Sequence, residues 1–206
     1  MTAPEATVFI VDDDSSVRSA LARLVKSLGL PVETFASAQE FLNENHPEAP
    51  SCLVLDIRMP GLSGLDLQEE LASAGLTMPI IFITGHGSVP QSVRAMKAGA
   101  VDFLEKPFDD QALLDAIHQA IEKDRQARQE QMDIAEIQQR VDLLTPRERE
   151  VFALVVTGML NKQIAFKLGI SQKTVKVHRA RVMEKMQAES VADLVRSAEK
   201  AGVSPS

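Results

Sequence analysis

The segment Thr7-Val8-Phe9-Ile10-Val11-Asp12-Asp13-Asp14 joins a short apolar run to three consecutive carboxylates. β-Branched and aromatic residues in such a run favour a buried strand. The chain contains four further runs of this kind: Val32–Phe35, Leu53–Leu55, Ile80–Thr84 and Ala100–Leu104. The stretches between the runs carry apolar residues at helical spacing, and Asp14 or Ser15 can cap the first of these helices. Strands that alternate with helices predict an α/β fold with a parallel sheet covered on both faces.

Charged and hydroxyl side chains stand where the predicted strands end. Asp12 and Asp13 follow the first strand, Asp56 follows the third, Thr84 ends the fourth and Lys106 follows the fifth. The carboxyl ends of parallel strands lie at one edge of a sheet, so these side chains are expected to meet there. Neighbouring carboxylates repel one another, and all-oxygen ligands favour Mg²⁺. The sequence therefore predicts a magnesium site at this edge.

The composition of the 206 residues excludes several classes of protein. Apolar residues make up 45% and charged residues 25%, which is ordinary globular usage and not that of a disordered chain. No apolar run approaches the roughly 20 residues that span a bilayer, and the N-terminus does not resemble a signal peptide. The single cysteine, Cys52, excludes a disulfide framework and a cysteine-based zinc site. We expect a cytoplasmic protein without a membrane partner.

The charge divides the chain into two modules. Residues 1–125 hold 19 acidic and 9 basic residues, a net charge of −10, whereas residues 126–206 hold 10 and 13, a net charge of +3. Such asymmetry indicates that the modules have different partners, and a basic stripe favours a polyanion. We predict a first domain over residues 1–123, a helical linker over 124–141 and a second domain over 142–206.

The predicted linker has two parts of different character. Residues 122–131 contain Ala127 as their only apolar residue, which is typical of a solvated helix. Apolar residues then recur on one helical face, at Ile134, Ile137, Val141 and Leu144. This face could pack on a partner helix, and a coiled coil is one alternative. The sequence leaves open whether the linker is one continuous helix.

The second domain shows the pattern of a small four-helix protein. Thr145 and Pro146, with Glu148 three residues after the threonine, predict a capping box at the first helix. Asn161 is predicted to cap the second helix, and Gly169-Ile170-Ser171 forms a tight turn before the third. A helix, a glycine-containing turn and another helix at this spacing are typical of a helix-turn-helix.

The third helix of this domain divides by face. Val175, Val182 and Met186 recur at helical spacing and are expected to pack inward. The other side is predicted to face the major groove of DNA and carries Lys173, Lys176, Val177 and Ala180.

Four motifs of the first domain resemble the receiver domain of two-component response regulators, in its FixJ-like branch. The motifs are Val11-Asp12-Asp13-Asp14, Leu55-Asp56-Ile57-Arg58-Met59-Pro60-Gly61, Ile83-Thr84-Gly85-His86-Gly87 and Phe103-Leu104-Glu105-Lys106-Pro107-Phe108. The resemblance covers about residues 5–123. It implies a doubly wound, flavodoxin-like sheet of five strands in the order 2-1-3-4-5.

The resemblance also implies a role for each site residue. Asp56 accepts a phosphoryl group from a phosphohistidine. Magnesium is bound by Asp13 directly, by Asp12 through water, by Asp56 and by the main-chain carbonyl of Arg58. Lys106 and Thr84 contact phosphoryl oxygens, and Phe103 turns inward after phosphorylation. The family further implies a cis peptide before Pro107, and control of the phosphoryl lifetime by Arg58 and His86.

The second domain resembles the LuxR-type DNA-binding domain over about residues 142–203. Its motifs are Leu144-Thr145-Pro146-Arg147-Glu148-Arg149-Glu150-Val151, Asn161-Lys162-Gln163-Ile164-Ala165 and Ser171-Gln172-Lys173-Thr174-Val175-Lys176-Val177-His178-Arg179. The resemblance implies that Lys176 and Val177 touch base edges. The candidates for phosphate contacts are Lys162, Thr174, Arg179 and Arg181, and His178 is expected to pack beneath the helix.

Together these observations predict a transcription regulator switched by phosphorylation. Its expected partners are a sensor histidine kinase, double-stranded DNA, RNA polymerase and a second copy of the chain that joins after phosphorylation. One alternative is a DNA-binding regulator whose receiver serves only for dimerisation. Another is an enzyme of aspartyl-phosphate chemistry, but no acid–base residue for a leaving group is evident, so we expect no turnover of an external substrate.

Overall fold

The computed structural model describes residues 6–44, 49–85 and 87–202. The chain forms two compact units, residues 1–128 and residues 129–206. Each unit has its own apolar core.

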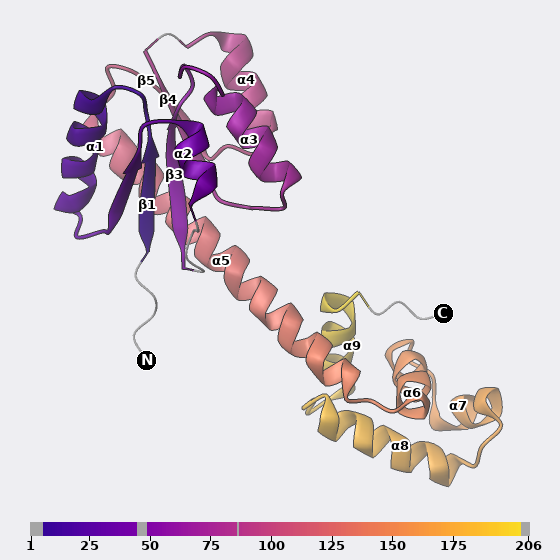
Figure 1. Ribbon diagram of the computed structural model, residues 1–206. Helices are drawn as coiled ribbons and strands as arrows, with labels where there is room; N and C mark the ends of the chain where they lie inside the picture. Colours follow the sequence, from indigo (N-terminus) through magenta and orange to yellow (C-terminus); the bar gives the residue numbers. More distant parts are fainter. Residues whose placement is uncertain (1–5, 45–48, 86, 203–206) are drawn as a thin grey trace. The chain divides into compact units, whose positions relative to one another are not determined.

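The first unit contains the predicted α/β sheet. Its strands are β1 (Thr7–Val11), β2 (Val32–Phe35), β3 (Ser51–Asp56), β4 (Ile80–Thr84) and β5 (Asp102–Glu105). They are all parallel and lie in the order β2-β1-β3-β4-β5, as predicted (Figure 1). Strand β3 begins two residues earlier than predicted, because Ser51 already pairs with Thr7 of β1. Strand β5 begins two residues later, since its register with β4 starts at Asp102.

Five helices cover the two faces of this sheet, as the alternation predicted. Helices α2 (Ala38–Asn43), α3 (Gly64–Ser73) and α4 (Val89–Lys97) pack on one face. Helix α1 (Ser15–Ser27) and the first part of α5 (Asp110–Asp142) pack on the other (Figure 1). Cys52 is fully buried on β3 and packs in the core.

Helix α5 contains the whole segment that was predicted as a linker. It runs from Asp110 to Asp142, so residues 124–141 are helical throughout and contribute to both units. Ile137 and Val141 are buried in the core of the second unit, together with Leu144. The apolar face thus packs within its own unit, and only Ile134 on this face is exposed.

The second unit continues with α6 (Pro146–Val156), α7 (Asn161–Leu168), α8 (Gln172–Lys185) and α9 (Val191–Lys200). The capping box of α6 is confirmed: Thr145 accepts from the amide of Glu148, whose carboxylate accepts from the amide of Thr145. The predicted cap of α7 is wrong by one residue. Leu160 is the N-cap because its backbone is still extended while its carbonyl accepts from the amide of Ile164, and Asn161 is the first helical residue.

Candidate functional site

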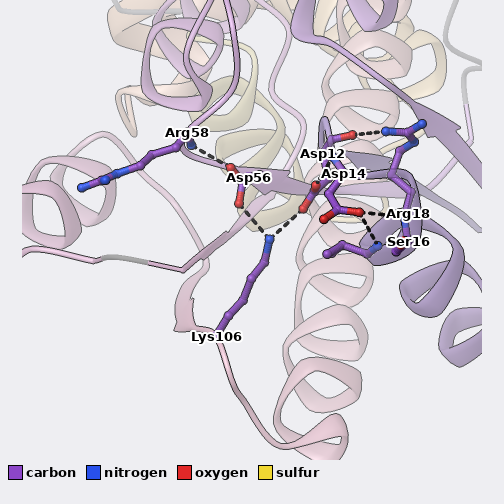
Figure 2. A network of polar contacts seen from close by, with 8 residues as sticks. Asp12, Asp14, Ser16, Arg18, Asp56, Arg58 and Lys106 are labelled. Carbon is purple, nitrogen blue, oxygen red and sulfur yellow. Dashed lines mark hydrogen bonds and ion pairs between the residues drawn. The ribbon is translucent and has the colours of Figure 1, made fainter.

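The ends of three strands meet around the ammonium group of Lys106. Its Nζ lies 2.7 Å from Oδ2 of Asp12, which follows β1, and 2.9 Å from Oδ1 of Asp56, the last residue of β3 (Figure 2). Asp12 is 1% exposed and Asp56 is 5% exposed. The structure therefore brings together three residues that the sequence placed at this edge, and the cation bridges two buried carboxylates.

The charges of this cluster influence one another. Burial raises the pKa of Asp56 above its usual value, and the neighbouring Asp12 adds to the effect, while Lys106 opposes it. Burial also acts to lower the pKa of Lys106, but its hydrogen bonds to Asp12 and Asp56 outweigh this and raise the pKa. Lys106 thus stays a cation that neutralises part of the charge of the two carboxylates.

Main-chain contacts fix the orientation of both carboxylates. Oδ1 of Asp12 accepts from the amide of Asp14, and Oδ2 of Asp56 accepts from the amide of Arg58. Asp14 is also the N-cap of α1, where it accepts from the amides of Ser16 and Val17. The side chain of Arg58 points away from Asp56 (Figure 2). Asp13, the residue after the buried Asp12, is exposed and lines an open groove together with Arg58.

The donor set fits a magnesium ion of the kind that binds few protein ligands. Within residues 6–44, 49–85 and 87–202, no three His, Cys, Asp or Glu side chains converge as a metal cage. Mg²⁺ does not need such a cage, because it keeps several waters and takes one or two carboxylates together with phosphate oxygens. Asp12, Asp56 and the adjacent Asp13 supply such oxygens, and the remaining negative charge favours a cation.

The predicted switch residues lie next to this cluster. Thr84 is fully buried at the end of β4, and its carbonyl accepts from the amide of Lys106 at 2.7 Å. Phe103 on β5 is half-buried against the core, and a Cβ added to Gly87 would lie 3.0 Å from its ring. The peptide before Pro107 is cis, as the resemblance implied. His86 lies outside the described residues.

In the second unit, α8 presents the predicted polar face. Val175, Val182 and Met186 are buried, which confirms the inward face. On the other side, Lys173, Lys176 and Ala180 are exposed, and Val177 is 46% exposed. Three of the predicted phosphate contacts are also exposed: Lys162, Thr174 and Arg181.

Two basic residues of α8 are bound within the protein. Nη1 of Arg179 donates to Oδ1 of Asn161 at 3.0 Å. Lys185 donates to Oε2 of Glu148 at 2.7 Å and to the carbonyl of Leu143 at 3.0 Å. The hydrogen bond from Lys185 is the largest cause that lowers the pKa of Glu148 to about 2. His178 is half-buried, with Nδ1 enclosed, in agreement with a packing role.

The sequence did not indicate two further polar residues of the first unit. Asp124 lies in the stretch that looked solvated, yet it is 3% exposed and accepts from the amide of Ser51 and from Arg128. Arg18 on α1 donates to the main-chain carbonyl of Asp12 at 2.6 Å (Figure 2). For Asp124 the sequence did contain a signal. At helical spacing it falls on the same face as three apolar residues: Ile117, Ala120 and Ile121.

None of the described helices is both long enough and apolar enough to span a bilayer.

Comparison with known proteins identifies relatives of both units. Residues 8–118 match the family described as response regulator receiver domain, and residues 142–198 match bacterial regulatory proteins, luxR family. The chain is 54% identical over 200 residues to Nodulation protein W of Bradyrhizobium diazoefficiens, which covers 97% of this chain and 88% of that protein. It is 47% identical over 198 residues to the transcriptional regulatory protein FixJ of Azorhizobium caulinodans, which covers 96% and 94% of the two chains. The solved structure of the response regulator StyR is similar with a TM-score of 0.85 and 50% identity, over 95% of this chain and 99% of that one.

Proposed function

Because this chain belongs to the two-component response regulators that join a receiver domain to a LuxR-type DNA-binding domain, we propose that phosphorylation of Asp56 controls its binding to DNA. The family consists of transcription regulators and not of enzymes that turn over a substrate. Such a regulator has a sensor kinase and DNA as partners. The proposal concerns which residues of this chain carry out each step.

Asp56 is the nucleophile of the phosphoryl transfer. A carboxylate oxygen attacks the phosphorus of a phosphohistidine, so an O–P bond forms and the N–P bond to the imidazole breaks. Lys106 is hydrogen-bonded to Asp56 and is placed to hold an oxygen of the incoming phosphoryl group. Asp12, Asp13, Asp56 and the main-chain carbonyl of Arg58 would hold Mg²⁺, which offsets charge on the nucleophile and on the phosphoryl group.

The switch proceeds from the phosphoryl group to Thr84 and Phe103. Phosphorylation replaces the Asp56 carboxylate by an acyl phosphate whose phosphoryl group bears about −1.5 to −2 charges, and the Thr84 hydroxyl turns to a phosphoryl oxygen. Phe103 then turns into the space that Thr84 leaves. To shift the receiver from about 1% to about 99% in its active state requires about 5.5 kcal/mol of stabilisation of the active state relative to the inactive one. The new contacts of Lys106 and Thr84, together with those that a bound metal would add, would supply this free energy. A dimer then forms through α4 and β5, and Val93 and Met96 of α4 are exposed.

The second unit reads DNA through α8. Lys176 and Val177 contact base edges in the major groove, and Lys173 lies on the same face. Phosphate contacts by Lys162, Thr174 and Arg181 fix the register, and the sequence motif assigned Arg179 to the same set. We further propose that the protein works in the cytoplasm and that RNA polymerase is its partner at the promoter.

One observation carries this proposal: the bridge of Lys106 between Asp12 and Asp56, in a chain that also carries a helix-turn-helix. The test selects and sequences genomic DNA fragments bound in the presence of Mg²⁺ and a small phosphodonor, with wild type and Asp56→Asn in parallel. We expect specific sites with wild type alone. Equal recovery by both proteins would instead favour a regulator that does not depend on phosphorylation.

A further inference from the structure

The basic residues of α8 fall into two groups by their surroundings. Lys173, Lys176 and Arg181 are exposed, and among the described residues none of them makes a hydrogen bond or an ion pair. Arg179 is half-buried and donates from Nη1 to Oδ1 of Asn161. One of the five N–H donors of its guanidinium is therefore bound to a neighbouring helix, whereas Lys173, Lys176 and Arg181 are free to meet a polyanion.

The helical register explains this difference. Arg179 stands one turn after Val175 and one turn before Val182, and both valines are fully buried. It belongs to the inward face of α8, which packs on the rest of the unit. Lys173, Lys176, Val177 and Ala180 occupy the opposite side. From the inward face, the side chain of Arg179 reaches Asn161 at the start of α7 more directly than it reaches the major groove of DNA.

We propose that Arg179 is a positioning residue, which acts through Asn161 to set the angle between α7 and the recognition helix α8. This inference rests on the proposed DNA binding by α8 and assigns Arg179 a role other than the phosphate contact that its motif implies. Asn161 suits this role, because its side chain does not cap α7 and its Oδ1 accepts from Arg179 instead. A hydrogen bond from a charged donor is stronger than a neutral one and has a defined direction.

The consequence concerns which bases the protein distinguishes. Lys176 and Val177 can reach base edges only if α8 enters the groove at a fixed angle. Lys185 holds the far end of α8 to Glu148 and to the carbonyl of Leu143, and Arg179 holds its middle to α7. Without the bond between Arg179 and Asn161, α8 keeps its buried valines and the contacts of Lys185 but loses a contact that fixes its angle to α7. The fit to bases then weakens, while the number of phosphate contacts is unchanged.

The test measures affinity against salt concentration for four full-length variants: Arg179→Ala, Asn161→Ala, the double variant and Arg181→Ala. The probes are DNA fragments selected by phosphorylated wild type, together with fragments that carry single base changes. We expect Arg179→Ala and Asn161→Ala to weaken binding to the selected site about tenfold and to reduce discrimination between bases. Their salt slopes should equal that of wild type, and the double variant should bind no worse than either single one.

Arg181→Ala is the matched control for a phosphate contact. It should lower the salt slope by about one unit per bound protomer and leave base discrimination intact. The inference is overturned if Arg179→Ala also lowers the salt slope and leaves base discrimination intact, while Asn161→Ala binds as wild type does. Thermal unfolding followed by circular dichroism establishes that each variant is folded. If Arg179→Ala is not folded, Arg179→Lys takes its place, since it keeps the charge but lacks the guanidinium whose Nη1 reaches Asn161.

Failure of the proposed function gives a different result. In that case wild type itself would select no specific fragment, and both the proposed function and this inference would fall. If wild type selects fragments and only the pattern among the variants differs, the proposed function stands and the inference alone is overturned.

Discussion

The ammonium nitrogen of Lys106 lies 2.9 Å from Oδ1 of Asp56, so the cation that would receive a phosphoryl oxygen is already bound to the nucleophile. The same ammonium is 2.7 Å from Asp12, which keeps hold of it if Asp56 turns toward phosphorus. This shared cation lowers the repulsion between the two buried carboxylates before any metal or phosphate arrives.

Replacement of Lys106 by alanine should slow phosphorylation of Asp56. The variant loses a preorganised cation at the position where negative charge gathers, an effect of about 100-fold on the rate. The measurement follows incorporation from a small phosphodonor by intact-protein mass spectrometry, with Mg²⁺ present. Lys97→Ala is the control, because Lys97 is exposed on α4 and makes no contact with the cluster. A Lys106→Ala protein that is phosphorylated at the wild-type rate would remove Lys106 from the mechanism.

Gly64 allows α3 to begin against the main chain of the nucleophile. A Cβ at this position would lie 2.3 Å from the carbonyl oxygen of Asp56. Gly64→Ala should therefore displace the end of β3, lower the free energy of unfolding of the receiver by about 1–3 kcal/mol and slow phosphorylation. Gly85→Ala is the control, since a Cβ there meets nothing within 4 Å. Chemical denaturation followed by circular dichroism compares the two, and equal stability would contradict the argument.

The buried carboxylate of Asp124 stabilises the receiver through the amide of Ser51 and the guanidinium of Arg128. Asp124→Ala leaves a buried amide without its acceptor, which should cost about 1–3 kcal/mol of unfolding free energy. Asp124→Asn keeps an acceptor oxygen and should cost less. Glu122→Ala, on the exposed side of the same helix, should change stability by less than about 0.5 kcal/mol. Similar losses for Asp124→Ala and Glu122→Ala would show that the buried contact does not stabilise the receiver.

Strand alternation was enough to predict the edge where Asp12, Asp56, Thr84 and Lys106 gather. Parallel strands with right-handed crossovers place their carboxyl ends together, so position along the chain translates directly into position in space. The sheet order came from the resemblance, because alternation alone does not rank one doubly wound order above another.

The contacts of Asp124 and Arg179 could not be predicted in the same way. Both residues are charged and stand in polar stretches, so the sequence assigned Asp124 to a solvated helix and Arg179 to a phosphate contact. Their contacts depend on a partner in another segment of the chain: Ser51 for Asp124 and Asn161 for Arg179. Periodicity describes one helix face at a time and does not identify which main-chain amide or side-chain amide lies opposite.

The ion pair between Glu148 and Lys185 should make the stability of the second unit depend on pH. The pKa of Glu148 is lowered from 4.5 to about 2, so the folded state favours the ionised carboxylate. Its contribution is fully present above the unfolded pKa and is lost as the pH falls toward the folded pKa. The stability difference between wild type and Glu148→Gln should thus be largest near neutral pH, of the order of 2–3 kcal/mol, and should shrink between about pH 5 and pH 2.

Thermal unfolding of both proteins across this pH range measures the difference. Glu150→Gln is the control, because Glu150 is half-exposed in its pair with Arg147 and the substitution should change stability little. A difference for Glu148→Gln that stays constant from neutral pH to pH 3 would contradict the assignment.

The last turns of α5 should behave as part of the DNA-binding unit and not as a free connection. Ile137 is 9% exposed and packs in the core with Val151 and Phe152, whereas Ile134 on the same face is 36% exposed. Ile137→Ala should lower the stability of the second unit by about 2–4 kcal/mol, because it leaves a cavity in this core. Ile134→Ala removes the same atoms from a site open to solvent and should cost clearly less.

Hydrogen exchange of the α6 amides in the full chain, followed by mass spectrometry, reports the stability of this unit separately from that of the receiver. We expect faster exchange in α6 for Ile137→Ala and not for Ile134→Ala. Unchanged exchange for Ile137→Ala would mean that α5 does not stabilise the second unit. The apolar face of α5 would then be free for a partner helix.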